Sequence, residues 1–474
     1  VGLAFMLERI GAPDGLVRVL PPLLALSSVV LIGALMRTTR MAAFYAADRV
    51  GSPLYIGGAF TAVAVGLVAS VSVTAPSAPP FIGLAIGFVL AAMVVGPLGR
   101  RTGASSLRDI VSARFDNPLF GFIFGLAYFI TGLLITSVGY ESAVQALGPL
   151  LNASRHDAII ITAIIVLLIV APGGLAGFFW VAAATAGMIA FVLLLPIGLR
   201  IMADVGAGAP MLGGGAEAAA RARDMLTQYK AWPLADPWLN EVGAALGVAI
   251  LPPLSAGAFV GLTSYQATRV GVYSLVVILV FAIAFALGTP LWRAENGAAA
   301  QSLFASGLLM AALICAAAGA QTASRAVSAH AVYGREGVLA SQRLARARGL
   351  TILAVAFSGW LAYRQVIVPE KSFFIAIAIA LSILGPPLAL SFSARAQAAH
   401  AIAAIVASLA TMAGLAYANA WAVSAAQAPT IALIGAVAGF AVGWGFSAFG
   451  APRPENLEPG RSALFIDSPF DGGA

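Results

Sequence analysis

The sequence is poor in the residues that soluble proteins and metalloenzymes depend on. Only 9% of its 474 residues are charged, whereas a soluble domain carries about 25%. Its single cysteine, Cys315, excludes a disulfide framework within the chain. Its three histidines are scattered and form no H-E-x-x-H pattern, so an intramembrane enzyme or a resident metal site is not predicted.

Apolar residues dominate the chain instead. They make up 61% of it, and the mean hydropathy is +0.96, which is more apolar surface than a soluble core of this size can bury. Runs long enough to form membrane-spanning helices occur at approximately 16–36, 54–74, 81–98, 119–139, 158–171, 178–201, 243–263, 270–289, 302–323, 351–368, 372–392, 398–420 and 429–449. The sequence therefore predicts an all-α polytopic membrane protein with about thirteen spans.

The distribution of basic residues predicts the orientation. With thirteen spans, 16 Lys and Arg residues fall on the side that holds the C-terminus and 10 on the other side. Cytoplasmic loops carry the excess of basic residues in membrane proteins. We therefore expect the N-terminus outside and the C-terminus in the cytoplasm of a cell inner (plasma) membrane, and the net charge of +7 needs no nucleic-acid partner.

Helix breakers recur at a spacing that is typical of transporters. Two glycines stand near the start of the second span and two prolines stand within the seventh, five spans later. Inverted repeats of five helices often begin with an interrupted helix, which leaves backbone groups free to bind solute and ion; ordinary kinks are the alternative explanation. The solute-site candidates are Gly57, Gly58, Pro252, Pro253, Ser255 and Gly257.

The same symmetry divides the chain into parts. We predict an N-terminal extra helix and linker (1–53), a first inverted repeat (54–202), an extracellular loop (203–242), a second inverted repeat (243–393), two C-terminal helices (394–450) and a cytoplasmic tail (451–474). None of the segments between the spans is long enough to be a catalytic domain.

Four short motifs lie in the linkers and turns between the spans. They are Phe44-Tyr45-Ala46-Ala47-Asp48-Arg49, Ser106-Leu107-Arg108-Asp109-Ile110 continuing to Phe115, Gly173-Gly174-Leu175-Ala176-Gly177, and Ala326-Val327-Ser328 with His330 and Tyr333. In order and spacing they resemble motifs of the solute:sodium symporter family, in particular its branch near the bacterial acetate permeases. The resemblance covers nearly the whole chain and implies the leucine-transporter-like fold, with alternating access to a central solute site.

The resemblance also implies where a sodium ion would bind, and there the sequence departs from the family. Carbonyl groups of a broken helix and hydroxyl groups of a later helix hold the ion in the family. The matching positions are Thr61, Ala64, Ala311, Ile314 and Cys315. Ile314 offers no oxygen and Cys315 only a soft sulfur, whereas a hard cation needs oxygen ligands. We therefore expect this sodium site to be absent or altered.

A proton is the usual substitute for sodium, and it requires an ionisable group at membrane depth. Glu141, at the end of the fourth span, and His330, at the cytoplasmic end of the ninth, are the proton-relay candidates. For Glu141, an interfacial carboxylate that faces water is the alternative. We expect no organic cofactor, with Na+ or H+ as the coupling ion.

These observations predict a cation-coupled symporter of a small organic solute, with a short monocarboxylate as the class that the family branch indicates. Related permeases often carry Leu-Pro-His in the seventh span and an Arg-Phe pair after it. Here the span reads Leu251-Pro252-Pro253 without that His or Arg, so a carboxylate would lose a cationic partner. The alternative is a non-transporting, symporter-like membrane sensor or partner-binding module.

Overall fold

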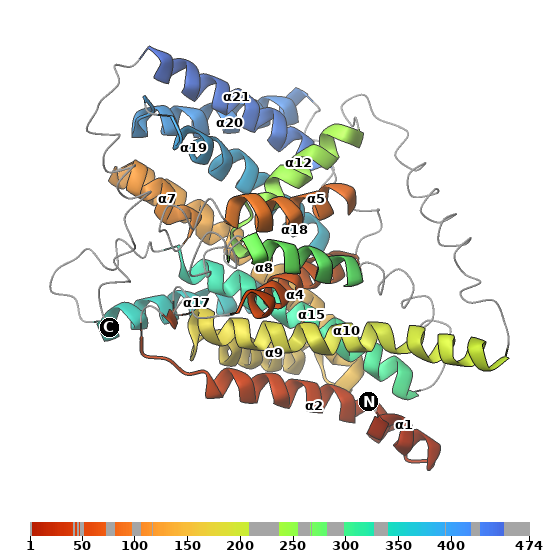
Figure 1. The fold of residues 1–474 in the computed structure, drawn as a ribbon. Coiled ribbons are helices and arrows are strands. Elements are labelled where there is room, and N and C mark those ends of the chain that lie inside the picture. Colours follow the sequence, from red (N-terminus) through yellow and green to blue (C-terminus); the bar gives the residue numbers. More distant parts are fainter. Residues whose placement is uncertain are drawn as a thin grey trace.

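A computed structural model describes residues 2–40, 43–44, 47, 52–72, 81–96, 106–115, 117–207, 237–254, 266, 268–281, 298–326, 340–393, 395–418 and 427–449. All regular structure in this part of the chain is helical (Figure 1). The labelled helices are α1 (Gly2–Arg9), α2 (Asp14–Leu35), α4 (Pro53–Ser72), α5 (Phe81–Leu90), η2 (Ala91–Val95), α7 (Leu107–Arg114), α8 (Pro118–Leu151), α9 (Arg155–Val170), α10 (Gly174–Ala207), α12 (Pro237–Ala249), α15 (Ala298–Ser324), α17 (Ala340–Tyr363), α18 (Pro369–Ile379), η3 (Ala380–Leu384), α19 (Gly385–Leu390), α20 (Ala398–Ala418) and α21 (Ala428–Ala448).

Nine stretches of helix among the described residues are long and apolar enough to cross a membrane. They include α2, α4, α8, α15, α20 and α21 over their full length or nearly so. The other four predicted spans coincide with shorter helices, namely α5 with η2, α9, α12 and the Thr268–Phe281 helix. Each of the thirteen predicted spans thus contains a described helix.

The long helices run between two ends of the molecule. At one end, Arg18 of α2, Leu150 of α8 and Gln301 of α15 line the same cavity. At the other end, Arg348 of α17 donates to the carbonyl oxygen of Thr38, just after α2. We call these the Arg18 end and the Arg348 end; in Figure 1, α1 marks the Arg18 end at the right. The predicted orientation places the Arg18 end outside.

The centre of the fold is the crossing of α8 and α15, the third helices of the two predicted repeats. A Cβ atom added to Gly132 of α8 would lie 2.6 Å from the backbone nitrogen of Ala323. Two helical turns further along α8, a Cβ on Gly139 would lie 2.5 Å from the carbonyl oxygen of Ala312. Rising numbers on α8 therefore match falling numbers on α15, so the two helices are antiparallel. Such a pair is expected where an inverted repeat relates equivalent helices.

Two of the family-like motifs meet at the Arg348 end. Gly174 has a positive φ of 56°, a conformation that glycine adopts without strain, and it lies against the ring of Phe44. Phe44 also forms a small buried cluster with Leu344 and Ala347 of α17. Arg348 donates to the carbonyl oxygens of Ala171 at 2.9 Å and Thr38 at 2.8 Å. The motifs that lie apart in the sequence thus form one structural contact.

The two C-terminal helices cover one side of the second predicted repeat. Glycines of α21 allow close packing on α20: a Cβ on Gly435 would lie 2.9 Å from the carbonyl oxygen of Ser408. At its start, α21 also contacts α12, where Thr430 donates to Asn240 at 3.4 Å. This hydrogen bond holds the first turn of α12 against α21.

Candidate functional site

The seventh predicted span is interrupted at its prolines, as the sequence predicts. Helix α12 ends at Ala249, Leu251 has no helical conformation, and residues 252–254 are helical again. Proline lacks a backbone N–H and its ring displaces the preceding turn, so Pro252 and Pro253 end the helix here. Ser255 and Gly257, the next two solute-site candidates, lie outside the described residues.

The expected break at Gly57 and Gly58 is wrong, because α4 is one continuous helix from Pro53 to Ser72. Gly57 instead permits a close approach: an added Cβ would lie 3.2 Å from the backbone nitrogen of Ser274 on the Thr268–Phe281 helix. Gly58 has open space beside it. Within a membrane, where no water competes for the backbone, two glycines do not suffice to unwind a helix.

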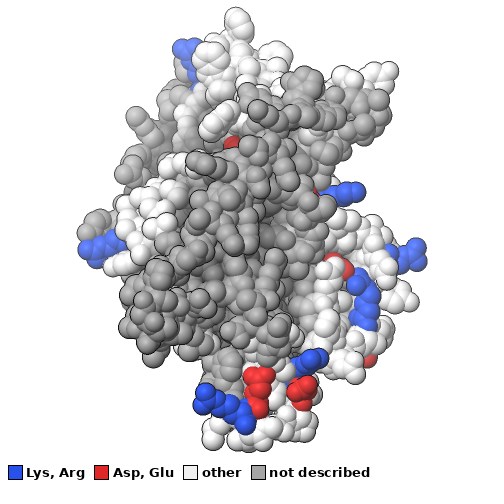
Figure 2. All heavy atoms as spheres, turned by 90° about the vertical axis from the view of Figure 1, so that its right-hand side faces the viewer, with Lys and Arg blue, Asp and Glu red and all other residues white. Residues whose placement is uncertain are grey.

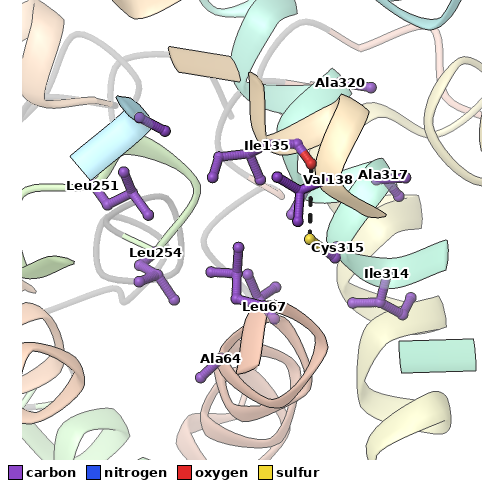
Figure 3. Packing of buried hydrophobic residues seen from close by; sticks show 14 of the residues in the cluster. Ala64, Leu67, Ile135, Val138, Leu251, Leu254, Ile314, Cys315, Ala317 and Ala320 are labelled. Carbon is purple, nitrogen blue, oxygen red and sulfur yellow. Dashed lines mark hydrogen bonds between the residues drawn. The ribbon is translucent and has the colours of Figure 1, made fainter. Parts of the chain in front are cut away.

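Apolar side chains fill the space between α4, α8, α15 and the interrupted segment (Figure 3). Leu67 of α4 lies opposite Leu251 and Leu254 of the interruption, and each is no more than 1% exposed. Ile135 of α8 and Cys315 of α15 close the same region and are fully buried. The described part of the centre therefore offers packing surfaces for apolar groups and few hydrogen-bonding groups.

The aligned sodium positions do not form an oxygen cage in the described geometry. In a continuous helix, the carbonyl oxygens of Thr61 and Ala64 accept the N–H groups four residues on, so they are not released for an ion. The hydroxyl of Thr61 donates to the Gly57 carbonyl oxygen at 2.9 Å, on the side away from α15. Ala311 and Cys315 face Gly66 of α4 instead.

Cys315 also has a contact of its own. Its sulfur lies 3.8 Å from the carbonyl oxygen of Ile135, so it packs between α15 and α8 (Figure 3). Ile314 is buried on another side of α15 and adds only carbon atoms. The described residues also contain no group of three or more His, Cys, Asp or Glu side chains that could hold a metal ion. The altered sodium site stays a prediction.

Glu141 is buried and paired, not exposed to water as the alternative interpretation had it. Only 4% of the residue is accessible, and its two oxygens each lie 2.8 Å from the same nitrogen of Arg155. Arg155 also donates to the carbonyl oxygen of Ala362 at 2.8 Å, and Gln145 donates to Glu141 at 3.1 Å. The ion pair thus joins α8, α9 and α17 at the Arg18 end. His330, the other proton-relay candidate, lies outside the described residues.

A cavity of about 440 Å³ opens at the Arg18 end between α2, α4, α8 and α15. Its polar lining consists of Arg18, Ser70, Ser142, Gln145, Gln301 and Ser302. These residues do not stand out in the sequence, because one polar residue near the end of a span is indistinguishable from an ordinary interfacial residue. Only the packing of the four helices shows that they surround one space.

Comparison with solved structures identifies a similar fold. A Na+-coupled sialic acid symporter, in a substrate-bound outward-open state, matches with a TM-score of 0.68 and 17% identity over 92% of this chain and 98% of that chain. A manganese transporter of Eremococcus coleocola (TM-score 0.44, 14% identity, 87% of this chain and 95% of that one) and inward-facing Mhp1 (0.40, 13%, 94% and 95%) match too weakly to add to this.

No family model matches the chain, and no curated protein matches it in sequence. The likeness to the sialic acid symporter shows the fold alone. The chain has an all-α, leucine-transporter-like fold, as the resemblance of its linker motifs implies. The prediction of membership in the solute:sodium symporter family stays a prediction.

Proposed function

We propose that this protein is a cation-coupled secondary active transporter, a symporter of a small organic solute, with short monocarboxylates as its substrate class. It would lie in the inner (plasma) membrane with the Arg18 end outside. The observation that carries the proposal is the interruption at Pro252 and Pro253, which lies against α4 in a fold shared with a symporter. Broken helices at such positions supply backbone groups for solute and ion in transporters of this kind.

The coupling ion follows from the chemistry of α4 and α15. Because Ile314 and Cys315 provide no oxygen and α4 is unbroken, sodium coupling through the aligned positions is disfavoured. We therefore propose proton coupling, with Glu141 and His330 as the candidates. Sodium coupling through other residues is the outcome that would overturn this part of the proposal.

A non-transporting sensor or partner-binding module is the second candidate, and one observation favours it. Leu67, Leu251 and Leu254 meet in the centre of the fold, where a transporter needs room for its solute. If these side chains never separate, the fold has been kept for binding without transport.

Uptake into proteoliposomes tests the proposal. We expect labelled acetate, propionate or butyrate to accumulate beyond the level in protein-free liposomes when a proton gradient is imposed, and not when a sodium gradient or no gradient is imposed. Uptake that depends on sodium would contradict proton coupling but would still support the proposal that the protein is a transporter. No uptake of these acids, or of a wider panel of small solutes, by folded protein under any gradient would contradict transport and favour the sensor.

The interruption itself can be tested with a matched pair of variants. Replacing Pro252 and Pro253 together by alanine lets the helix continue through the interruption, and we expect uptake to fall at least about tenfold, equivalent to about 1.4 kcal/mol in the transport barrier. The control replaces Pro386 and Pro387, a buried pair at the start of α19, where proline is tolerated. Equal losses in both variants would show that the interruption has no particular role.

A further inference from the structure

We propose that the cavity at the Arg18 end is a binding site for a monocarboxylate with a short aliphatic tail. This inference rests on the proposed function, since it places the first contact of the transported solute outside the centre of the fold. The volume of about 440 Å³ falls within the range of small-molecule sites, which is about 300–1,000 Å³. It exceeds what a two-carbon acid needs, which is why the tail belongs to the proposal.

Arg18 supplies the group that would recognise the carboxylate. It is the one charged residue among those that line the cavity in the described part of the chain. The hydroxyl of Ser302 donates to its carbonyl oxygen at 2.5 Å, which holds the Arg18 backbone against the first turns of α15. A guanidinium forms two parallel hydrogen bonds to a carboxylate and is suited to an anion of this shape. Arg18 thus offers the cationic partner that the seventh span lacks.

Asp14, one turn before Arg18 in α2, does not line the cavity, and two other acidic residues at this end are engaged by other groups. Glu141, which contacts the lining residue Gln145, is held by Arg155. Glu8 of α1 accepts a hydrogen bond from the backbone N–H of Ala298, at the start of α15, at 2.8 Å. Figure 2 looks onto this end and shows acidic and basic side chains together at its lower edge, where α1 lies. An incoming anion therefore meets Arg18 without an acidic residue in the lining itself.

The lining combines polar and apolar side chains. Gln145 and Gln301 are exposed and carry amide groups, whereas Ala69 of α4 and Leu308 of α15 present only carbon. Ala69 and Leu308 also line a second, very small cavity of about 10 Å³, together with Phe304 and residues of α10. An aliphatic tail suits these apolar side chains, and a second charged group does not.

Protection of an introduced cysteine tests binding without requiring transport. Cys315 is fully buried, so a polar maleimide is expected to leave the natural protein unlabelled. In an Ala305→Cys variant, the new thiol lies in the cavity lining, and butyrate should slow its labelling in a saturable way. The half-protecting concentration should fall about fourfold for each methylene from acetate to butyrate. Butanol and inorganic phosphate, which lack the carboxylate or the tail, should not protect.

Variants of Arg18 separate recognition from general effects of charge. Arg18→Gln should weaken protection by butyrate at least about tenfold. Arg18→Lys should weaken it less, because lysine keeps the positive charge but cannot form the two parallel hydrogen bonds of a guanidinium. Arg9→Gln removes an equal charge from the exposed α1 and should change nothing. An Ala153→Cys variant, at the same end but outside the cavity lining, should show no protection.

The outcomes are distinct for this inference and for the proposed function. Saturable protection without any uptake would support the site and contradict transport. Uptake of monocarboxylates without protection, or protection that survives Arg18→Gln, would overturn the site and leave transport standing. Protection by phosphate as strong as that by butyrate would also overturn it, since the site would then bind anions of any shape.

Discussion

Alanine at Gly139 is expected to lower the midpoint of thermal unfolding by about 1–3 °C in a chain of this length, although the substitution adds only one methyl group. The added carbon would overlap the backbone nitrogen of Ala316 and lie 2.5 Å from the carbonyl oxygen of Ala312. Both are backbone atoms in the middle of α15, so neither can turn aside as a side chain could. The helices must separate, and overpacking of this kind costs about 1–3 kcal/mol.

The same helix provides the control. Gly121 also lies in α8, but nothing lies within 4 Å of a Cβ placed there. Gly121→Ala should therefore leave the unfolding midpoint unchanged or raise it slightly, because alanine favours helix over glycine by about 1 kcal/mol. The unfolding midpoint of both variants is measured in detergent, by heating the protein and recording the loss of the monodisperse peak on size-exclusion chromatography. A Gly139→Ala protein as stable as Gly121→Ala would show that α8 and α15 are further apart than described.

A second substitution on the facing helix tests whether the contact is shared. A Cβ on Gly319 of α15 would lie 2.7 Å from the carbonyl oxygen of Gly132 in α8. Once α8 and α15 have been separated by Gly139→Ala, part of the room for a group at position 319 already exists. The loss caused by Gly319→Ala should therefore be smaller in the Gly139→Ala background than alone, because neighbouring sites in one contact are not additive.

Hydropathy located the spans because each is a local property of about 20 residues, and every predicted span contains a described helix. The resemblance of the linker motifs to the solute:sodium symporter family implied the leucine-transporter-like fold, which the likeness to a solved symporter shows. The α8–α15 crossing was not predicted. Gly125, Gly132 and Gly139 recur every seven residues on α8, but glycines are common in membrane helices and the spacing does not name its partner.

The site was harder to predict than the fold. Two prolines end a helix by their covalent structure, so the interruption at Pro252 and Pro253 could be foreseen. Glycine permits an unusual backbone conformation but does not impose one. At Gly57 the helix is regular, and the missing side chain instead allows close packing against Ser274. A pairwise property such as the partner of Glu141 cannot be seen from a single span. Arg155 is fourteen residues away, across the turn between α8 and α9.

Removing Arg155 while keeping Glu141 is expected to destabilise the protein by about 3 kcal/mol, at the lower end of the range for buried ion pairs. Glu141 would remain buried with its carboxylate opposed only by the amide of Gln145. The lower end applies because the side chain of Arg155 is 34% exposed, so water screens part of the attraction. The carbonyl oxygen of Ala362 would lose a donor at the same time. Arg155→Met in detergent, compared with the natural protein, measures this loss.

The paired variant Glu141→Gln with Arg155→Met separates a clamp from a proton carrier. If the two residues mainly join α8, α9 and α17, removing both charges should recover most of the stability lost by Arg155→Met, since no unpaired charge remains buried. A clamp also predicts that folded Glu141→Gln protein keeps proton-driven uptake. A carrier predicts the opposite: uptake driven by the proton gradient would be lost in Glu141→Gln, whatever its stability. Because stability and coupling are read separately, one set of variants decides whether the buried carboxylate of Glu141 holds the scaffold together or moves the proton.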